Sequence, residues 1–245
     1  KLSASCESGN TMKILVVGAG FAGATIAREL ANDGHTVVVM DERNHIGGNA
    51  YDYTNQHGIR IHKYGPHIFH TNNKKVYDWV TQYGEWVEYK HKVKAQLADG
   101  QYVTLPVNRH TKEIVGEDNI IDTFYRPYTK KMWGKELEEL DPSITKRIPI
   151  RDDDNELYFP EHGSNNKLTT LTYEEPCDYV VNDHQRYYPV KDINGENKRI
   201  YKTYKDIENR KVTFIGRCGM YVYIDMDQAI NSSLAVVTEY RESIK

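Results

Sequence analysis

The sequence has few cysteines, no polybasic stretch and no long apolar run, and each shortage excludes a class of protein. Its 245 residues include only three cysteines, Cys6, Cys177 and Cys218, which are widely spaced and form no C-x-x-C pair. A disulfide framework or structural zinc site is therefore not indicated, and a reducing, cytoplasmic setting is expected. The net charge of −3 gives no indication of binding to nucleic acid or to an anionic membrane.

Long hydrophobic segments are also missing. The longest apolar stretch, residues 14–27, is interrupted by glycines, so no transmembrane span is predicted. Residues 1–11 lack the apolar core of a signal peptide and are expected to be a loose tail or tag remnant. His67 and His70 have no third ligand at a convincing spacing, so a metal site is not predicted.

The strongest pattern is a strand–helix–strand unit that ends at Asp41. Residues 14–17 form an apolar run that predicts a strand buried on both faces, and residues 36–40 predict a second one. Between them lies a G-x-G-x-x-G motif, whose glycines are Gly18, Gly20 and Gly23. These glycines permit a tight turn, close approach of a diphosphate and close packing of the helix, whose N-terminus binds phosphate. Because Asp41 can accept hydrogen bonds from a ribose, the unit predicts a dinucleotide site.

The loop behind this unit favours FAD over NAD. Asp41, Glu42 and Arg43 form an acid-x-Arg pattern, which paired glycines at Gly47 and Gly48 follow. The same order recurs among FAD-binding proteins of the glutathione-reductase type, where the arginine can meet ribose or phosphate. A surface loop with a glycine turn is the alternative.

Periodicity predicts several further elements. A helix face with Val76, Trp79, Val80 and Tyr83 turned inward is expected over residues 74–83. The other predicted elements are a short strand at 59–61, a hairpin at 92–97 and 101–105, a helix over 118–136, a buried strand at 211–217, and a helix capped by Asp225. Residues 151–186 are strongly polar, and no core contribution is predicted for them.

Eight motifs, in the same order along the chain, resemble the bacterial UDP-galactopyranose mutase family from residue 13 to about residue 240. They are GAGFAGATIARELA, DERNHIGGN, YGPHIFHT, LPVN, FYRPYTKKMWG, SITKRIPIR, YYPV and FIGRCGMYVYIDMD. The resemblance implies an α/β protein with a Rossmann-like FAD-binding fold of the glutathione-reductase type, a small helical domain and a reduced sheet domain.

The resemblance also implies a division into domains. The FAD-binding domain is expected at 12–73 and 205–245, a helical substrate domain with the hairpin at 74–140, and a remnant of the sheet domain at 141–204. Blocks of the family have no counterpart between Asn108 and about Asp118, and between about Phe159 and Thr172. Either the chain is shortened there, or the numbering runs across missing segments.

The activity that the resemblance implies is the isomerisation of UDP-galactopyranose to UDP-galactofuranose. In this family a reduced FAD is the active form, and its N5 displaces UDP to give a covalent sugar adduct. Family members are often homodimers. The resemblance therefore gives FAD as the cofactor and a UDP-galactose nucleotide sugar as the partner.

Site residues follow from the motifs one by one. The FAD-binding positions are Gly18, Gly20, Phe21, Gly23, Asp41, Glu42, Arg43, Gly48, Asn49, His67, Arg217, Asp225 and Met226. The substrate-binding positions are Phe124, Tyr128, Trp133, Arg147, Tyr158 and Tyr223. The catalytic positions are His67, Arg147, Tyr223 and Asp225. The aromatic residues among them could instead form an ordinary helix core, above all Phe124.

The sequence departs from the family at the diphosphate clamp. Arg147 matches one arginine that grips the diphosphate, but the second falls in a block that this chain lacks. His91 stands where the family has an asparagine of the uridine pocket. Two alternatives stay open, namely an FAD oxidoreductase related to the amine oxidases and a non-catalytic relative that only binds nucleotide.

Overall fold

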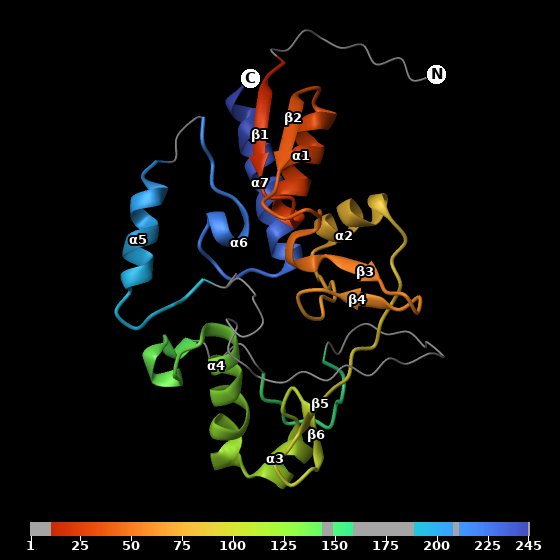
Figure 1. Cartoon of the computed structure of the whole chain (residues 1–245), viewed down its shortest axis with the longest axis vertical. Coiled ribbons are helices and arrows are strands. Elements are labelled where there is room, and N and C mark those ends of the chain that lie inside the picture. The colour runs from red at the N-terminus through yellow and green to blue at the C-terminus, as the bar shows by residue number, and fades with distance from the viewer. Residues whose placement is uncertain (1–10, 144–148, 159–188, 208–210, 245) are drawn as a thin grey trace. The chain divides into compact units, whose positions relative to one another are not determined.

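The structure is a computed structural model, and it describes residues 11–143, 149–158, 189–207 and 211–244 (Figure 1). The chain falls into two compact units. The first unit comprises Lys1–Tyr83 and Ile207–Lys245, and the second unit comprises Gly84–Asp206.

The predicted strand–helix–strand unit is confirmed in the first unit. Strand β1 (Lys13–Val17) leads into helix α1 (Phe21–Asn32), and strand β2 (Thr36–Met40) follows. The strands are parallel, with Lys13 opposite Thr36 and Val17 opposite Met40. Their β-branched residues favour extended backbone, while α1 turns an apolar stripe toward the sheet.

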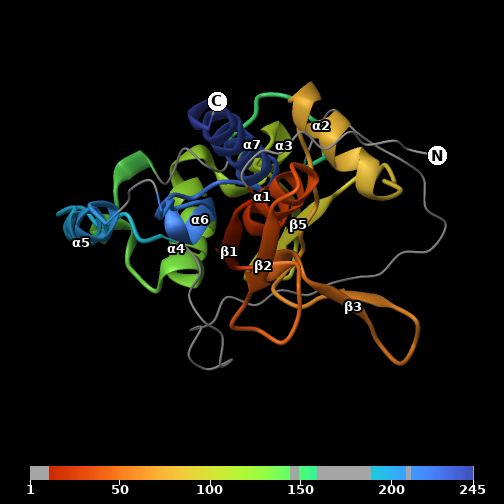
Figure 2. The ribbon, with the colours of Figure 1, turned by 90° about the horizontal axis from the view of Figure 1, so that it is seen from above.

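Helix α7 (Met226–Ser243) completes this core from the far end of the chain. It packs along α1, and Val237 joins Val16, Ile26 and Leu30 in one buried cluster. Both helices lie on the same side of the two strands (Figure 2). The predicted packing of the chain's C-terminal helix onto the unit begun at residue 13 is therefore confirmed.

An ion-pair network shows that α1 and α7 run in the same direction. Arg241, near the end of α7, contacts Glu29 at 3.0 Å and Asp33 at 2.7 Å, both near the end of α1. Since the two C-terminal ends lie together, the two N-termini lie together at the other end of the unit.

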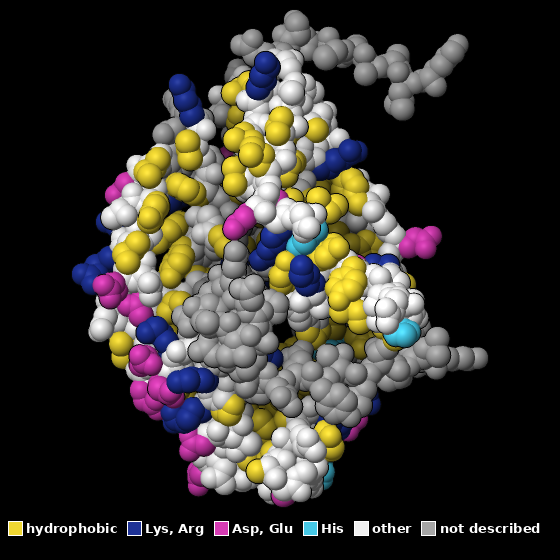
Figure 3. All heavy atoms as spheres, in the orientation of Figure 1, with side chains coloured by type: hydrophobic (Ala, Val, Ile, Leu, Met, Phe, Trp, Pro, Cys, Tyr) yellow, Lys and Arg dark blue, Asp and Glu magenta, His cyan; other side chains and the backbone are white. Residues whose placement is uncertain are grey.

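Two predictions for this sheet are wrong. Residues 211–217 form no strand of the β1–β2 sheet; helix α6 (Gly216–Gly219) occupies their end. The sheet is also not buried on both faces, because Leu15, Val17 and Met40 are 58%, 78% and 57% exposed. Hydrophobic side chains gather over β1 and β2 near the top of Figure 3. Among the described residues the sheet has only two strands, so helices cover one face and the other stays open.

Helix α2 (Lys74–Val80), with a 3-10 turn at Thr81–Tyr83, packs in the first unit rather than with the residues after it. Val76 and Val80 are buried against Ile230 and Leu234 of α7, which places the boundary between the units later than residue 74. Tyr83 is 47% exposed, so its predicted inward orientation is wrong. A short hairpin, β3 (Asp52–Thr54) with β4 (Arg60–His62), precedes α2, and a 3-10 turn at Gly48–Ala50 precedes the hairpin.

The second unit is built on the predicted hairpin. Strands β5 (Val93–Gln96) and β6 (Tyr102–Leu105) pair antiparallel and are followed by helix α3 (Arg109–Val115). A 3-10 turn at Glu117–Asn119, a π-helical turn at Ile121–Tyr125 and helix α4 (Arg126–Trp133) continue the chain without a break, followed by a 3-10 turn at Leu137–Glu139. Its core cluster is Val103, Val107, Ile120, Phe124 and Tyr125.

Two helices of the second unit were not predicted. One is α3, and the other is α5 (Glu196–Lys205), which lies in a stretch that the sequence assigns to a remnant sheet domain. Its residues are mostly charged or polar, and none is buried. None of the described helices is long and apolar enough to cross a membrane.

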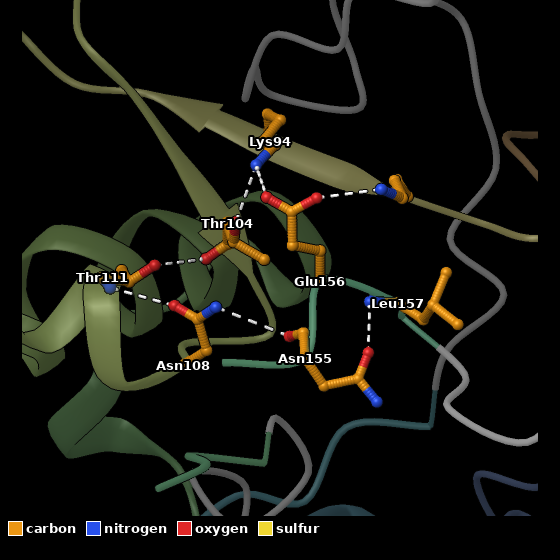
Figure 4. Close-up of polar contacts among 8 residues, drawn as sticks. Lys94, Thr104, Asn108, Thr111, Asn155, Glu156 and Leu157 are labelled. Carbon is orange, nitrogen blue, oxygen red and sulfur yellow. Dashed lines mark hydrogen bonds and ion pairs between the residues drawn. The ribbon is translucent and has the colours of Figure 1, made fainter. Parts of the chain in front are cut away.

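Polar contacts fasten the acidic segment 151–158 to the hairpin and α3 (Figure 4). Glu156 contacts Lys92 and Lys94, each at 2.9 Å, and these two lysines lower the pKa of its carboxyl to about 2. Asn108 donates to the Asn155 carbonyl at 3.5 Å, and the Arg151 N–H donates to the Val107 carbonyl, between β6 and α3, at 2.8 Å. This part of the polar tract is thus held by charge and hydrogen bonds.

Candidate functional site

The glycine loop between β1 and α1 is closed tightly enough that only glycine fits at its end. A Cβ atom on Gly23 would lie 1.9 Å from the carbonyl oxygen of Gly18. Gly18 itself has φ 105° and donates its N–H to the Met40 carbonyl at 2.6 Å. The first turn of α1, which begins at Phe21, therefore lies directly beside the ends of both strands. Its unpaired N–H groups and dipole make this end an anion-binding position.

Asp41 ties the end of β2 to this loop. Its carboxylate accepts hydrogen bonds from the backbone N–H groups of Ala19 at 2.6 Å and Arg43 at 2.9 Å. These two bonds lower the pKa of the Asp41 carboxyl, so it is ionised at neutral pH. An ionised carboxylate has about four acceptor positions, which leaves capacity for a ribose hydroxyl.

The paired glycines lie against the first loop, a contact that the sequence did not predict. Gly47 donates its N–H to the Ala19 carbonyl at 2.9 Å. A Cβ atom on Gly48 would lie 2.9 Å from the Cα of Gly20, and Gly48 has φ 57°. The two loops are therefore in backbone contact, and a side chain at Gly48 would push them apart.

Arg43 is held beside these loops by the predicted Asn49 and by Tyr64, His45 and Tyr51, which sequence reasoning did not find. Its Nη1 donates to Asn49 Oδ1 at 2.9 Å, and its guanidinium carbon lies 4.3 Å from the centre of the Tyr64 ring. His45 Nε2 lies 2.7 Å from the Tyr64 hydroxyl, and the His45 ring stacks on Tyr51 at 3.9 Å. Glu42, beside Arg43, is exposed.

The beginning of α7 lies at the same end of the first unit. Thr71 donates to Asp227 at 3.0 Å, and a Cβ on Gly216 would lie 2.9 Å from the Cβ of Ala22. Asp225 precedes Met226, the first residue of α7, and its N–H donates to Gln228 at 2.9 Å. Two helix N-termini therefore lie near the glycine loops.

Arg217 and Tyr223 form a pair next to this helix start. The Arg217 Nη2 donates to the Ile224 carbonyl at 2.8 Å, and its guanidinium carbon lies 4.4 Å from the centre of the Tyr223 ring. The pair therefore fixes the residues that lead into Asp225.

His67 is set up to be neutral at physiological pH. Burial lowers the pKa of its imidazole, the hydrogen bond to the Gly65 carbonyl opposes this in part, and the nearby charges of His62 and Arg217 lower the pKa further. Its Nδ1 lies 2.5 Å from the Gly65 carbonyl, which can only accept, so Nδ1 carries the proton. The Nε2 atom is then an acceptor.

The predicted substrate residues lie in the second unit, except Tyr223. Phe124 is 7% exposed within the core cluster, and Trp133 is 2% exposed against Leu140. Tyr128 packs edge-on against Trp133 at 6.1 Å. The Tyr158 N–H donates to the His91 carbonyl at 2.8 Å, and their rings lie 5.6 Å apart. Arg147 lies outside the described residues, so these substrate assignments stay predictions.

The described residues contain no group of three or more histidine, cysteine or acidic side chains that could hold a metal ion.

Comparison with protein families gives two matches. Residues 16–83 match an NAD(P)-binding Rossmann-like domain, and residues 123–165 match UDP-galactopyranose mutase. The chain is 38% identical over 186 residues to a probable UDP-galactopyranose mutase of Klebsiella pneumoniae, covering 61% of this chain and 48% of the relative. This chain matches part of a UDP-galactopyranose mutase.

A second curated mutase is similar over nearly the same number of residues. A dTDP-fucopyranose mutase of Escherichia coli is 39% identical over 184 residues, with 60% of this chain and 48% of the relative covered. A crystal structure of reduced UDP-galactopyranose mutase has a TM-score of 0.41 at 17% identity, covering 60% of this chain and 38% of that one. The chain spans about half the length of the curated mutases it matches.

Proposed function

We propose that this chain binds FAD through the loops of its first unit and interconverts the pyranose and furanose forms of a nucleoside-diphosphate sugar, UDP-galactose. The observation that carries this proposal is the similarity to sugar-nucleotide mutases, which includes the mutase-specific match over residues 123–165. A Rossmann-like unit alone would support nucleotide binding but no particular reaction.

The residues of the first unit fit a dinucleotide. The backbone contact between Gly20 and Gly48 leaves no side chain between the two loops, and the N-terminus of α1 opens beside them. In our proposal these N–H groups bind the diphosphate, Asp41 binds a ribose, and Arg43 binds ribose or phosphate. Arginine suits that role because its charge is permanent and its donors form a planar fork.

When bound, reduced FAD would supply the nucleophile that displaces the nucleoside diphosphate from the sugar. The chain's own residues bind and orient. We assign to the N-terminus of α7, with Asp225 and Met226, the stabilisation of negative charge on the flavin ring. A neutral His67 would present Nε2 as an acceptor beside that ring, and Arg217 would hold the approach to α7.

For the substrate, we assign to residues of the second unit the diphosphate (Arg147 and Tyr158) and the base and sugar (Phe124, Tyr128 and Trp133). Arginine binds a diphosphate strongly because two parallel charged hydrogen bonds form at once. Two relatives of nearly equal identity are named for a UDP sugar and a dTDP sugar, so the base and the sugar need to be tested separately.

A second candidate, nucleotide binding without turnover, is favoured by the open face of the β1–β2 sheet. Parallel strands are usually covered on both faces, yet Val17 is 78% exposed. The chain also covers only about half of each mutase, and its 186 aligned positions with the Klebsiella protein include gaps, since they span only 61% of these 245 residues. A block of the mutases within the aligned range therefore has no counterpart here.

The deciding experiment uses the full chain reconstituted with FAD. We would reduce it with dithionite, add UDP-galactofuranose or dTDP-fucofuranose in parallel, and separate the products by chromatography. Conversion of UDP-galactofuranose only under reduction supports the proposed mutase activity. Conversion of only the dTDP sugar would show that the substrate is a dTDP sugar and not UDP-galactose. Flavin binding without conversion supports the second candidate. The control is Arg147→Ala, which is expected to lose UDP binding and keep FAD.

A further inference from the structure

We propose that Tyr64 and His45 are positioning residues, which hold the Arg43 guanidinium ready for the adenosine-diphosphate half of the dinucleotide. This inference rests on the proposed FAD site and adds residues that neither the motifs nor the comparisons assign. In this proposal Tyr64 strengthens ligand binding by holding Arg43 and not by contacting the ligand itself.

The Arg43 head group is fixed from two sides. Asn49 Oδ1 accepts from Nη1 at 2.9 Å, and the face of the Tyr64 ring lies 4.3 Å from the guanidinium carbon. The backbone of Arg43 is fixed as well, because its N–H donates to Asp41 at 2.9 Å. A free arginine side chain loses considerable rotamer freedom when it binds a ligand, and fixing it beforehand removes part of that cost.

The Tyr64 ring is in turn held by His45. His45 Nδ1 lies 3.0 Å from the Ile46 carbonyl, so Nδ1 carries the ring proton in the neutral imidazole. Nε2 is then an acceptor, and the Tyr64 hydroxyl donates to it at 2.7 Å. His45 stacks on Tyr51 at 3.9 Å with the rings 12° from parallel, which stops the imidazole from turning away.

The cluster lies where a dinucleotide would enter. Asn49, the partner of Arg43, follows Gly48, whose backbone touches Gly20 of the first loop. Asp41, which binds the N–H of Arg43, also binds the N–H of Ala19 in that loop. Arg43 is thus tied to the second loop by its guanidinium and, through Asp41, to the first loop by its backbone. Held there, it would meet the ribose and phosphates rather than the flavin ring. Loss of Tyr64 is therefore expected to weaken FAD and ADP and to spare FMN.

The test is a double-mutant cycle on binding. Dissociation constants for FAD, ADP and FMN are measured by titration for the unchanged chain, Tyr64→Leu, Arg43→Ala and the double variant. Tyr64→Leu is expected to weaken FAD and ADP about 5- to 10-fold, the range of a partly desolvated cation–π contact, with FMN unchanged. When Arg43 is already alanine, adding Tyr64→Leu is expected to leave the dissociation constants for FAD and ADP unchanged. Tyr77→Leu, an exposed tyrosine on α2, is the matched control and is expected to have no effect.

Additive losses in the cycle, or an equal loss of FMN binding, would overturn the positioning role. If the unchanged chain binds neither FAD nor ADP, the proposed function fails before any variant is measured. Folding of each variant is checked by its thermal midpoint without ligand. Where Tyr64→Leu does not fold, Tyr64→Phe takes its place. That variant keeps the ring and loses the hydroxyl, and a coupled loss of about threefold is expected.

Discussion

The two units of this protein hold their loops by different means. In the first unit the loops are fixed by backbone contacts, such as the approach of Gly48 to Gly20 and the N–H bonds to Asp41. In the second unit the segment 151–158 also has backbone hydrogen bonds, such as Arg151 N–H to the Val107 carbonyl at 2.8 Å, but exposed ion pairs add to them, of which Glu156 with Lys94 is one. Close backbone packing therefore stabilises the loops of the first unit, and surface charge adds to the stability of the second. Added side-chain volume should destabilise the first unit more, and changes of pH or salt should affect the ion pairs of the second.

The largest loss of stability is expected when one buried core side chain in each unit is truncated to alanine. Ile230→Ala in the first unit and Ile120→Ala in the second each remove a side chain that is at most 1% exposed. Each should lower the free energy of unfolding by about 2–5 kcal/mol, because a cavity adds to the lost burial. Amide hydrogen exchange should rise mainly in the unit that carries the change. An equal rise in both units would show that they unfold as one.

Gly23→Ala tests the geometric control of the first unit. The added Cβ would lie 1.9 Å from a backbone oxygen, which no side-chain movement relieves. We expect a loss of about 3 kcal/mol in denaturant unfolding, the upper range for overpacking. Gly84→Ala is the control, since no atom lies within 4 Å of its added Cβ. A Gly23→Ala protein as stable as the parent would contradict the tight loop.

Asp41→Asn tests the tie between β2 and the glycine loop. The N–H bonds from Ala19 and Arg43 lower the pKa of Asp41, so its contribution to stability is present above its ordinary pKa. That contribution is lost as the pH falls through the lowered value. At pH 7 we expect the variant to be about 1.5 kcal/mol less stable, a typical value for a charged hydrogen bond. The difference should shrink in acid, and Glu239→Gln, an exposed acid on α7, should show none.

Glu156→Gln should give the smallest effect and the clearest dependence on charge. Glu156 is 45% exposed, so its pairs with Lys92 and Lys94 should contribute at most about 1 kcal/mol at pH 7. Its pKa falls from the usual 4.5 to about 2, so this contribution is present above the first value and disappears toward the second. High salt should remove it too, while leaving the Gly23→Ala effect unchanged. If salt changed the effects of both variants equally, charge would not distinguish how the two units hold their loops.

In the first unit, the elements formed by residues close together in the sequence could be predicted. The strands and α1 follow from a short pattern in which each glycine has a steric reason. The contact of Gly48 with Gly20 was not predicted, because paired glycines alone do not indicate which backbone they approach. The contacts of Arg43 with Tyr64, and of Tyr64 with His45, join irregular segments about twenty residues apart, and no periodic pattern reports such contacts. The predicted strand at 211–217 failed because apolar composition alone does not supply a neighbouring strand.

In the second unit, a turn signal was sufficient to predict the hairpin, but composition was not sufficient to predict every helix. Its hairpin was predicted because Asp99-Gly100 is a strong turn signal between alternating segments. Helix α5 was missed because its stretch is mostly charged or polar. Ile200, Tyr204 and the following Ile207 do recur with helical spacing, but they are 51%, 59% and 54% exposed and add no buried face. The burial of Phe124 was one of two readings that the sequence allowed, since a helix core face and an aromatic ligand pocket have the same spacing.

Binding of FAD by the loops at the ends of β1 and β2 can be measured by titration. FAD, NAD⁺, ADP and FMN would be titrated into the unchanged chain and into Gly48→Val, whose side chain would separate the two loops. We expect FAD to bind more tightly than NAD⁺ and FMN, and Gly48→Val to lose FAD and ADP binding together. Tighter binding of NAD⁺, or undiminished FAD binding by Gly48→Val, would contradict this proposal.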